Sequence, residues 1–279
     1  MSQTRSPTNE ADQTMRLIPL LLVSISITTT ARGSEVTIPA GDVALRADYA
    51  VPATPPVAPA IVALHGCGGP FPARDRQWRD LLTAAGHPVL LPDSFGSRGL
   101  GSQCKVAARR VSPTGKRLTD TIAAARWLAA RSETPAGGLV VMGWSNGGST
   151  VLAAATTGAM PPGLVRGYVA FYPGCSSFNR RADWSPGGQL LIVMGQSDDW
   201  TPVAPCRELA ERFPDRIKLV EIPGAYHDFD VPDHPVAVRQ GLAFTANGNG
   251  VAHAGTNEAG RTWALQAVPA WIAALPPVR

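Results

Sequence analysis

The stretch Gly138-Gly-Leu-Val-Val-Met-Gly-Trp-Ser-Asn-Gly-Gly148 decides how this chain folds. Its apolar run, residues 139–142, is typical of a strand buried on both faces. The chain then turns through residues 143–148 and continues as a small, alanine-rich segment, residues 149–156, which favours a helix. A G-x-S-x-G match gains its meaning from this order of strand, tight turn and helix.

Ser145 lies at the centre of that turn. A serine on a sharp strand-to-helix turn has strained backbone geometry, and a Cβ at the flanking glycines would collide with the neighbouring strand or helix. The hydroxyl would then project above the sheet at the positive end of a helix. We therefore predict that Ser145 is the nucleophile of a hydrolase; the alternative is a glycine-rich turn with an incidental serine.

The composition indicates one large α/β domain rather than two small ones, with 279 residues of which 44% are hydrophobic and 16% charged. The formal net charge is +4, but the basic residues are dispersed and cluster only in short pairs such as Arg109-Arg110. Nucleic-acid binding would require a denser basic stripe, so we expect no nucleic-acid partner.

The N-terminal segment is predicted to lie outside the fold. Met15-Arg16 precedes an apolar run, residues 17–27, and then small residues up to Gly33. This order is typical of a secretory signal cleaved near Ala31, and the run is short for a membrane span. We expect residues 1–31 to be a signal peptide with a polar extension and residues 32–279 to form the domain of an exported, periplasmic or secreted protein. A retained membrane anchor is the alternative.

Patterns of strands and helices alternate along the rest of the chain. This alternation predicts a mostly parallel sheet with helices on both faces and a site at the carboxyl ends of the strands. The last helix should be kinked or shortened by Pro269, and residues 230–257 should be irregular. Strands are expected at 35–39, 43–51, 60–64, 88–92, 139–142, 167–172, 189–194 and 217–222, and helices at 74–85, from Thr114 or Thr119 to 131, 149–156, 202–213 and 258–274.

Four cysteines, an even number, indicate disulfides in an exported chain: Cys67, Cys104, Cys175 and Cys206. Four cysteines allow three pairings. The first two follow strands that should be neighbours, as do the last two, which favours the pairs 67–104 and 175–206. Free thiols in a cytosolic protein are the alternative, and the spacing does not favour a zinc site.

Three side chains expected just past strand ends have the residue types of a hydrolytic triad, in the order Ser145, Asp198 and His227. A serine hydroxyl needs an imidazole to take its proton, and the imidazole needs a carboxylate to orient it and stabilise its charge. The chain order serine, aspartate, histidine is that of the α/β-hydrolases. Asp199 is the rival carboxylate, but we expect it to face solvent or cap the next helix.

Only His227 directly follows the last predicted strand, so it is preferred as the base. The competing histidines are His65, His87, His234 and His253. A metal cluster of His227 with its neighbours would match no recognised spacing, so we expect no metal. The residues considered for such a cluster are His227, Asp228, Asp230, Asp233 and His234.

The negative charge that develops on a substrate carbonyl requires two backbone N–H donors. We predict one from Asn146 and the other from the loop His65-Gly-Cys-Gly-Gly69, at Cys67 or Gly68. Aromatic residues near the same face should line the pocket or the core: Trp144, Tyr172 and Trp200.

With these residues in view, the chain resembles the dienelactone hydrolase family of α/β-hydrolases. The resemblance implies an eight-stranded α/β-hydrolase sheet, hydrolysis of an ester or lactone without a cofactor, and the roles of nucleophile, acid and base for Ser145, Asp198 and His227. The matching stretches are His65-Gly-Cys-Gly-Gly69, Leu91-Pro-Asp-Ser-Phe-Gly-Ser-Arg-Gly99, Gly143-Trp-Ser-Asn-Gly-Gly148, Phe171-Tyr-Pro-Gly-Cys175, Asp198-Asp-Trp-Thr-Pro202 with Cys206, and Ala225-Tyr-His-Asp-Phe-Asp230.

The chain departs from the family pattern in one respect: the founding enzymes use a cysteine nucleophile, and this chain has a serine. The departure favours a general carboxylesterase acting on a small ester or lactone over dienelactone itself. Arg98 is a candidate contact for a substrate carboxylate, with a surface arginine as the alternative. The other functions considered are a secreted polyester depolymerase or feruloyl-type esterase, and a non-catalytic binding protein with the same fold.

Overall fold

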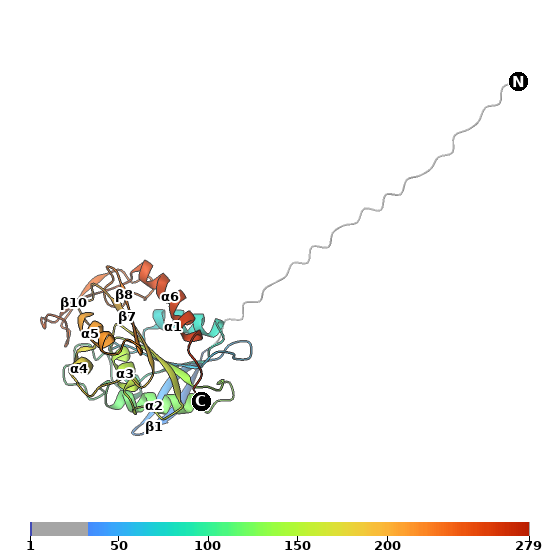
Figure 1. Ribbon diagram of the computed structural model, residues 1–279, viewed down its shortest axis with the longest axis horizontal. Coiled ribbons are helices and arrows are strands. Elements are labelled where there is room, and N and C mark those ends of the chain that lie inside the picture. Colours follow the sequence, from blue (N-terminus) through green and yellow to red (C-terminus); the bar gives the residue numbers. More distant parts are fainter. Residues whose placement is uncertain (2–32, 279) are drawn as a thin grey trace.

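The computed structural model describes residue 1 and residues 33–278, so the predicted signal peptide lies almost wholly outside the described residues. Strands and helices alternate through most of the described chain (Figure 1). The strands are β1 (Ser34–Ala40), β2 (Val43–Ala50), β3 (Ile61–Leu64), β4 (Val89–Pro92), β5 (Leu139–Trp144), β6 (Val165–Phe171), β7 (Gln189–Gly195), β8 (Ile217–Ile222), β9 (Ala237–Gln240) and β10 (Val251–Ala254). The helices are α1 (Pro72–Ala84), α2 (Lys116–Ala129), α3 (Asn146–Ala155), α4 (Ser176–Asn179), α5 (Ala204–Arg212) and α6 (Glu258–Ala273), with a 3₁₀ turn at Gly96–Arg98.

Eight strands form one sheet in the order β1-β2-β4-β3-β5-β6-β7-β8. The first two pairings, β1 with β2 and β2 with β4, are antiparallel, and the neighbours from β4 to β8 pair in parallel. The predicted mostly parallel sheet is therefore confirmed, with a two-stranded antiparallel edge.

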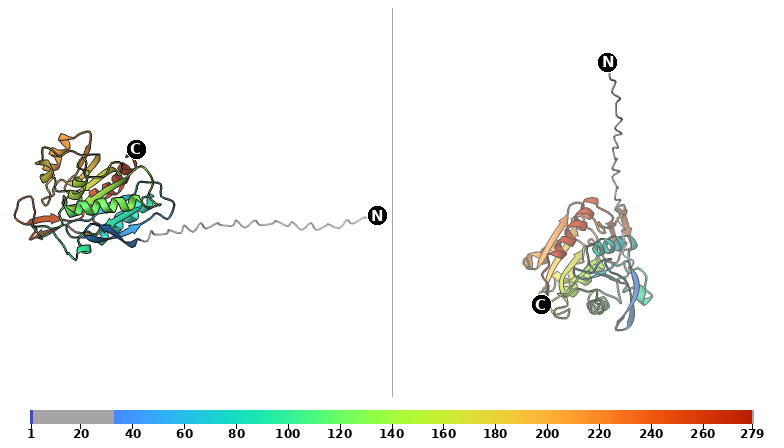
Figure 2. Two further views of the ribbon diagram at one scale, coloured as in Figure 1. Left: turned by 90° about the horizontal axis from the view of Figure 1, so that it is seen from below. Right: turned by 90° about the vertical axis from the view of Figure 1, so that its right-hand side faces the viewer.

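The centre of the sheet explains why the quoted stretch matters. All six residues of β5 are buried, because helices cover both faces of the sheet. Helix α1 packs beside α6 and α2 beside α3, and Figure 2 shows these two groups on opposite sides of the sheet. The core is a single cluster that runs through both layers, so the carboxyl end of β5 has a rigid surround.

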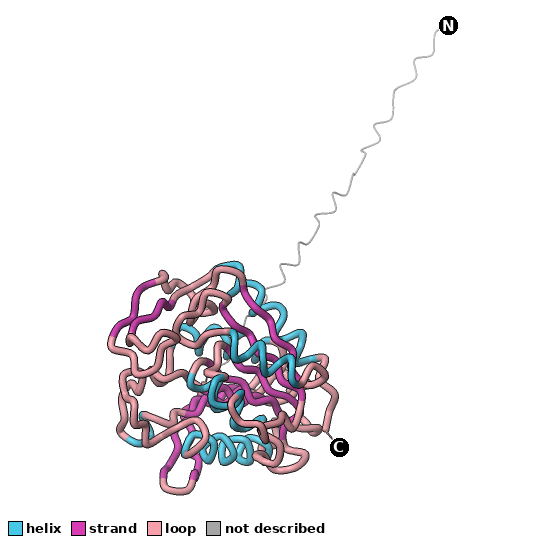
Figure 3. Tube along the Cα trace, turned by 60° about the vertical axis from the view of Figure 1, so that its left-hand side comes forward, coloured by secondary structure: helices cyan, strands magenta, loops and turns pink. Residues whose placement is uncertain are grey.

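Three details differ from the sequence-based expectations. The stretch 230–257 contains a hairpin of β9 and β10, which lies apart from the main sheet (Figure 3). Helix α6 runs through Pro269 without interruption to Ala273. Helix α2 begins after Gly115, and neither Thr114 nor Thr119 caps it.

Both predicted disulfides are present. Cys67 pairs with Cys104, and Cys175 pairs with Cys206. The first bond ties the loop after β3 to the long loop after β4. None of the helices in the described ranges has the length and apolar character that a membrane span requires.

Candidate active site

Ser145 occupies a strained turn between β5 and α3. Its backbone has φ 54° and ψ −115°, a region that residues with a Cβ rarely adopt. Its N–H donates to the carbonyl of Phe171 at 2.9 Å, which fixes the turn to the neighbouring strand. Strain of this kind persists only where surrounding contacts impose it, and here it raises the side chain above the end of the sheet.

The glycines around Ser145 are required by contact with the backbone. A Cβ on Gly147 would lie 2.1 Å from the carbonyl oxygen of Leu64, and one on Gly143 would lie 2.8 Å from the carbonyl carbon of Gly147. No real side chain tolerates such distances, so helix α3 can approach β3 and β5 this closely only with glycine. The steric reason predicted for the motif is therefore present in the structure.

His227 and Asp198 form a buried pair beyond the ends of β8 and β7. Nδ1 of His227 lies 2.8 Å from Oδ2 of Asp198. The other carboxylate oxygen of Asp198 accepts the backbone N–H groups of Trp200 and Thr201, both at 2.9 Å. These bonds fix the carboxylate, and the carboxylate favours the tautomer of His227 that carries its proton on Nδ1.

The surroundings of His227 set its basicity. Burial lowers the pKa of the imidazole, but the negative charges of Asp198, Asp228 and Asp230 outweigh burial, so that the pKa lies above its ordinary value. The rings of Tyr172 and Trp200 pack at 4.5 Å and 4.6 Å from the imidazole. The two rings hold the imidazole in place. The raised pKa makes this imidazole a stronger base than an ordinary histidine.

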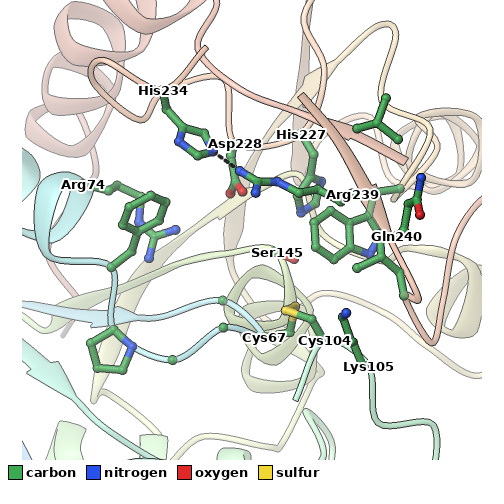
Figure 4. Close-up of a pocket in the computed structure, with 18 residues that line it drawn as sticks. Cys67, Arg74, Cys104, Lys105, Ser145, His227, Asp228, His234, Arg239 and Gln240 are labelled. Carbon is green, nitrogen blue, oxygen red and sulfur yellow. Dashed lines mark hydrogen bonds between the residues drawn. A yellow bond between two sulfur atoms is a disulfide. The ribbon is translucent and has the colours of Figure 1, made fainter. Parts of the chain in front are cut away.

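Ser145 and His227 line the same cavity of about 680 Å³ (Figure 4). Nε2 of His227 is buried and has no hydrogen-bond partner among the described residues. A buried nitrogen without a partner is costly, and it is the atom that would take a proton from a hydroxyl in this cavity. Basic side chains stand around the same space: Arg74, Lys105 and Arg239.

The predicted N–H donors lie on two sides of Ser145. Asn146 is the first residue of α3, so its N–H is among those that a helix leaves without an internal partner. Cys67 and Gly68 line the cavity from the loop after β3. In the described part of the chain, neither of their N–H groups donates to another backbone group. The arrangement can accept an oxyanion between the two segments.

The residues predicted for the pocket lie in different parts of the structure. Trp200 lines the cavity. Trp144 and Tyr172 are fully buried beneath it and do not form its wall, so of the two expected places, pocket and core, they occupy the core and not the pocket. Arg98 also lies elsewhere, because its guanidinium binds the carboxylate of Asp120 at 2.7 and 2.8 Å. It is an ion-paired structural arginine rather than a residue of this cavity.

The other candidate histidines and Asp199 form hydrogen bonds outside the group of Ser145, Asp198 and His227. Asp199 binds His253 at the rim, at 2.8 Å. His65 and His87 are buried and contact backbone carbonyls through Nδ1. His234 lines the cavity and pairs with the guanidinium of Arg239 at 2.6 Å. Within residues 33–278, no group of three potential ligands gathers closely enough to hold a metal ion.

Asp230 is a buried residue whose part in the site the sequence did not reveal. Its carboxylate accepts the indole N–H groups of Trp78 and Trp144 at 2.7 and 2.8 Å and the hydroxyl of Tyr172 at 2.6 Å. Burial raises its pKa, and the charge of Arg74 opposes that effect without cancelling it. The carboxylate thereby ties the loop that carries His227 to the strand that ends at Ser145. Its position three residues after His227 was the only available signal.

Comparisons with known proteins agree with this architecture. A family model described as the dienelactone hydrolase family matches residues 45–273. A search of curated proteins found no match.

Solved structures with the same fold cover most of the chain. A putative dienelactone hydrolase from Klebsiella pneumoniae is 17% identical with a TM-score of 0.65, and the match covers 88% of this chain and 99% of that one. A dienelactone hydrolase from Anabaena variabilis is 19% identical with a TM-score of 0.61, over the same shares of the two chains. A thermophilic esterase from Thermogutta terrifontis is 19% identical with a TM-score of 0.56, and the match covers 71% of this chain and 85% of that one.

Proposed function

The chain belongs to the dienelactone hydrolase family, and we propose that it is a serine hydrolase that cleaves a carboxylic ester or lactone through an acyl-enzyme on Ser145. One observation carries the proposal: a histidine held by a buried carboxylate, with an Nε2 that has no partner among residues 33–278, belongs to the same cavity as a serine on a strained turn. Serine, histidine and aspartate arranged in this way are the parts of nucleophilic acyl transfer.

The reaction proceeds in two halves. Nε2 of His227 takes the hydroxyl proton of Ser145 as the serine oxygen attacks the carbonyl carbon, and Nδ1–H donates to Asp198 throughout. The N–H groups of Asn146 and of Cys67 or Gly68 stabilise the oxyanion. The protonated His227 then gives its proton to the leaving alcohol, and the acyl group remains on Ser145. A water molecule, deprotonated by His227, releases the acid and restores the serine.

Labelling and turnover test this mechanism together. A fluorophosphonate probe should label Ser145, and the protein should hydrolyse p-nitrophenyl acetate. Ser145→Ala should abolish labelling and lower kcat by several orders of magnitude, on the order of 10⁴–10⁶.

Ser149→Ala is the matched control, since Ser149 lies one turn along α3, where its hydroxyl donates to the backbone carbonyl of Ser145 and accepts the backbone N–H of Gly174. It should keep the label and most of the activity. Absence of both label and turnover in the folded wild-type protein would favour the non-catalytic binding protein. A panel of esters and lactones of graded size, together with a polymer pull-down, separates a small-ester hydrolase from a depolymerase or a feruloyl-type esterase.

We also propose that the protein is exported, with residues 1–31 removed and the remainder forming one domain. The two disulfides support an oxidising destination, because such bonds persist outside the cytosol. N-terminal sequencing of the mature protein tests the proposal, which predicts a first residue near position 32. An N-terminus at Met1 or Met15 on protein recovered from the cell envelope would favour a retained anchor.

A further inference from the structure

Arg117 is a fully buried arginine on the first turn of α2, with 1% of its surface exposed. Its Nη1 donates to the side-chain oxygen of Asn146 at 2.6 Å, and its Nη2 donates to the backbone carbonyl of His65 at 2.8 Å. These two partners belong to the two segments that supply the oxyanion donors of the proposed mechanism: Asn146 itself and the loop that begins at His65. One planar guanidinium thus bridges both sides of the site.

We propose that Arg117 is a positioning residue that holds the two halves of the oxyanion hole at a fixed separation. The inference rests on the proposed function, since it gives these segments their role. Arginine suits the task because its N–H groups project in a rigid fork, so that both partners are fixed by one plane. An N–H donor contributes to catalysis only when it points at the oxyanion position, and a shift of one segment would weaken its bond in the transition state.

The electrostatic surroundings show how unusual this arginine is. In the described part of the chain, Nε of Arg117 has no partner, and no carboxylate binds its guanidinium. The nearby carboxylate of Asp120 is instead occupied by Arg98. Burial consequently lowers the pKa of Arg117 to about 9. A buried cation without a paired anion is costly, so the two hydrogen bonds to Asn146 and His65 are the contacts that hold this guanidinium in place.

Arg117 also acts on the first residue of the loop. Burial, followed by the charge of Arg117, holds the pKa of His65 well below its ordinary value. The neutral ring keeps its contacts with the Gly66 carbonyl at 2.8 Å and with the backbone N–H of Ser94 at 3.2 Å. The loop that carries Cys67 and Gly68 is therefore anchored through both its backbone and its leading side chain.

The test compares Arg117→Met, which keeps the length of the side chain without its donors, with Arg117→Lys, which keeps the charge without the fork. Turnover of p-nitrophenyl acetate is expressed per site labelled by the fluorophosphonate, so that unfolded protein does not count. Arg117→Met should lower kcat at least tenfold and change KM by less than threefold. Arg117→Lys should recover part of the loss.

Inhibition by phenylboronic acid, which forms a tetrahedral adduct on a nucleophilic serine, provides the readout that a merely structural role would not move. Its inhibition constant should rise in Arg117→Met by the factor by which kcat/KM falls. Leu128→Ala is the control, because Leu128 is fully buried and lies about three turns beyond Arg117 along α2, roughly 16 Å away by the rise of an α-helix. It should destabilise the fold and leave kcat per labelled site unchanged.

The outcomes separate the two proposals. A wild-type protein without esterase activity rejects the proposed function and the positioning role with it. An active wild type with an unchanged kcat in Arg117→Met, a change in KM alone, or an equal loss of kcat in Leu128→Ala rejects the positioning role only. If Arg117→Met does not fold, Asn146→Ala removes one of the two acceptors and keeps the backbone N–H. Its kcat should fall with KM unchanged, and an unchanged kcat overturns the inference.

Discussion

Two adjacent aspartates each hold a histidine at the same distance. Asp198 binds His227 at 2.8 Å, and Asp199 binds His253 at 2.8 Å. The exposed fractions of the histidine and aspartate side chains are 1% and 0% in the first pair and 38% and 31% in the second. Bond length alone therefore does not distinguish a candidate catalytic pair from a pair at the rim.

The difference lies in what surrounds each histidine. His227 is enclosed by the rings of Tyr172 and Trp200, and its second nitrogen has no hydrogen-bond partner within the described residues. The backbone N–H of His253, on strand β10, also donates to Asp199 at 2.8 Å. The second pair thus secures the hairpin to the loop after β7. Burial makes the first pair electrostatically strong, and water screens the second.

The largest expected effect comes from exchanging the two carboxylates for amides. Asp198→Asn should lower kcat by about 10⁴, because the amide favours the wrong tautomer of His227. Asp199→Asn should leave kcat for p-nitrophenyl acetate within a fewfold of wild type. Steady-state kinetics on both variants measures the two kcat values. An equal decrease in kcat for both variants would contradict the proposed distinction between the two pairs.

The same contrast between buried and exposed positions is expected for glycines of the backbone. Gly147→Ala should cost about 3 kcal/mol or more of folding free energy, because its Cβ would meet the Leu64 carbonyl at 2.1 Å and the core cannot yield. Gly248→Ala, in the loop between β9 and β10, should cost only about 1–2 kcal/mol, since the position has open space and only a positive φ to strain. Urea denaturation measures the free energy of unfolding of both variants. An unchanged value for Gly147→Ala would contradict the close contact of Gly147 with the Leu64 carbonyl.

A smaller effect is expected on the pH profile. Activity requires neutral His227, whose pKa is raised, so kcat/KM should increase with pH through a midpoint above 6.5, the ordinary histidine value. Asp228 contributes to that increase and has φ 59°, which asparagine tolerates well. Asp228→Asn should therefore move the midpoint to lower pH. Asp199→Asn is the control and should not move it; a shift of equal size there would contradict the assignment.

The smallest effect is expected at the rim. His253→Gln should change the free energy of unfolding by no more than about 1 kcal/mol, as is usual for a partly exposed ion pair. Thermal unfolding provides the measurement. A loss of several kcal/mol would show that the hairpin carries much of the stability of the domain.

Local patterns along the chain were sufficient to predict the sheet, because each buried strand leaves an apolar run and each helix an apolar stripe. The expected neighbouring strands favoured, among three possible pairings, the two disulfides that the structure contains. The hairpin was missed because short, exposed strands such as β9 lack that signal. Helix α6 tolerates Pro269 despite the lost N–H, since Val268 and Ile272 on either side of it are fully buried against the core.

Residue types and chain order alone pointed to Ser145, Asp198 and His227, because acyl transfer needs these three groups close together and parallel strands end at the same edge of a sheet. Only the tertiary structure revealed the roles of Arg117 and Asp230, whose side chains bond to groups between 29 and 152 positions away along the chain. It also moved Arg98, Trp144 and Tyr172 out of the cavity wall. Hydrogen bonds between distant segments depend on the three-dimensional packing, which leaves no periodic pattern in the order of residues.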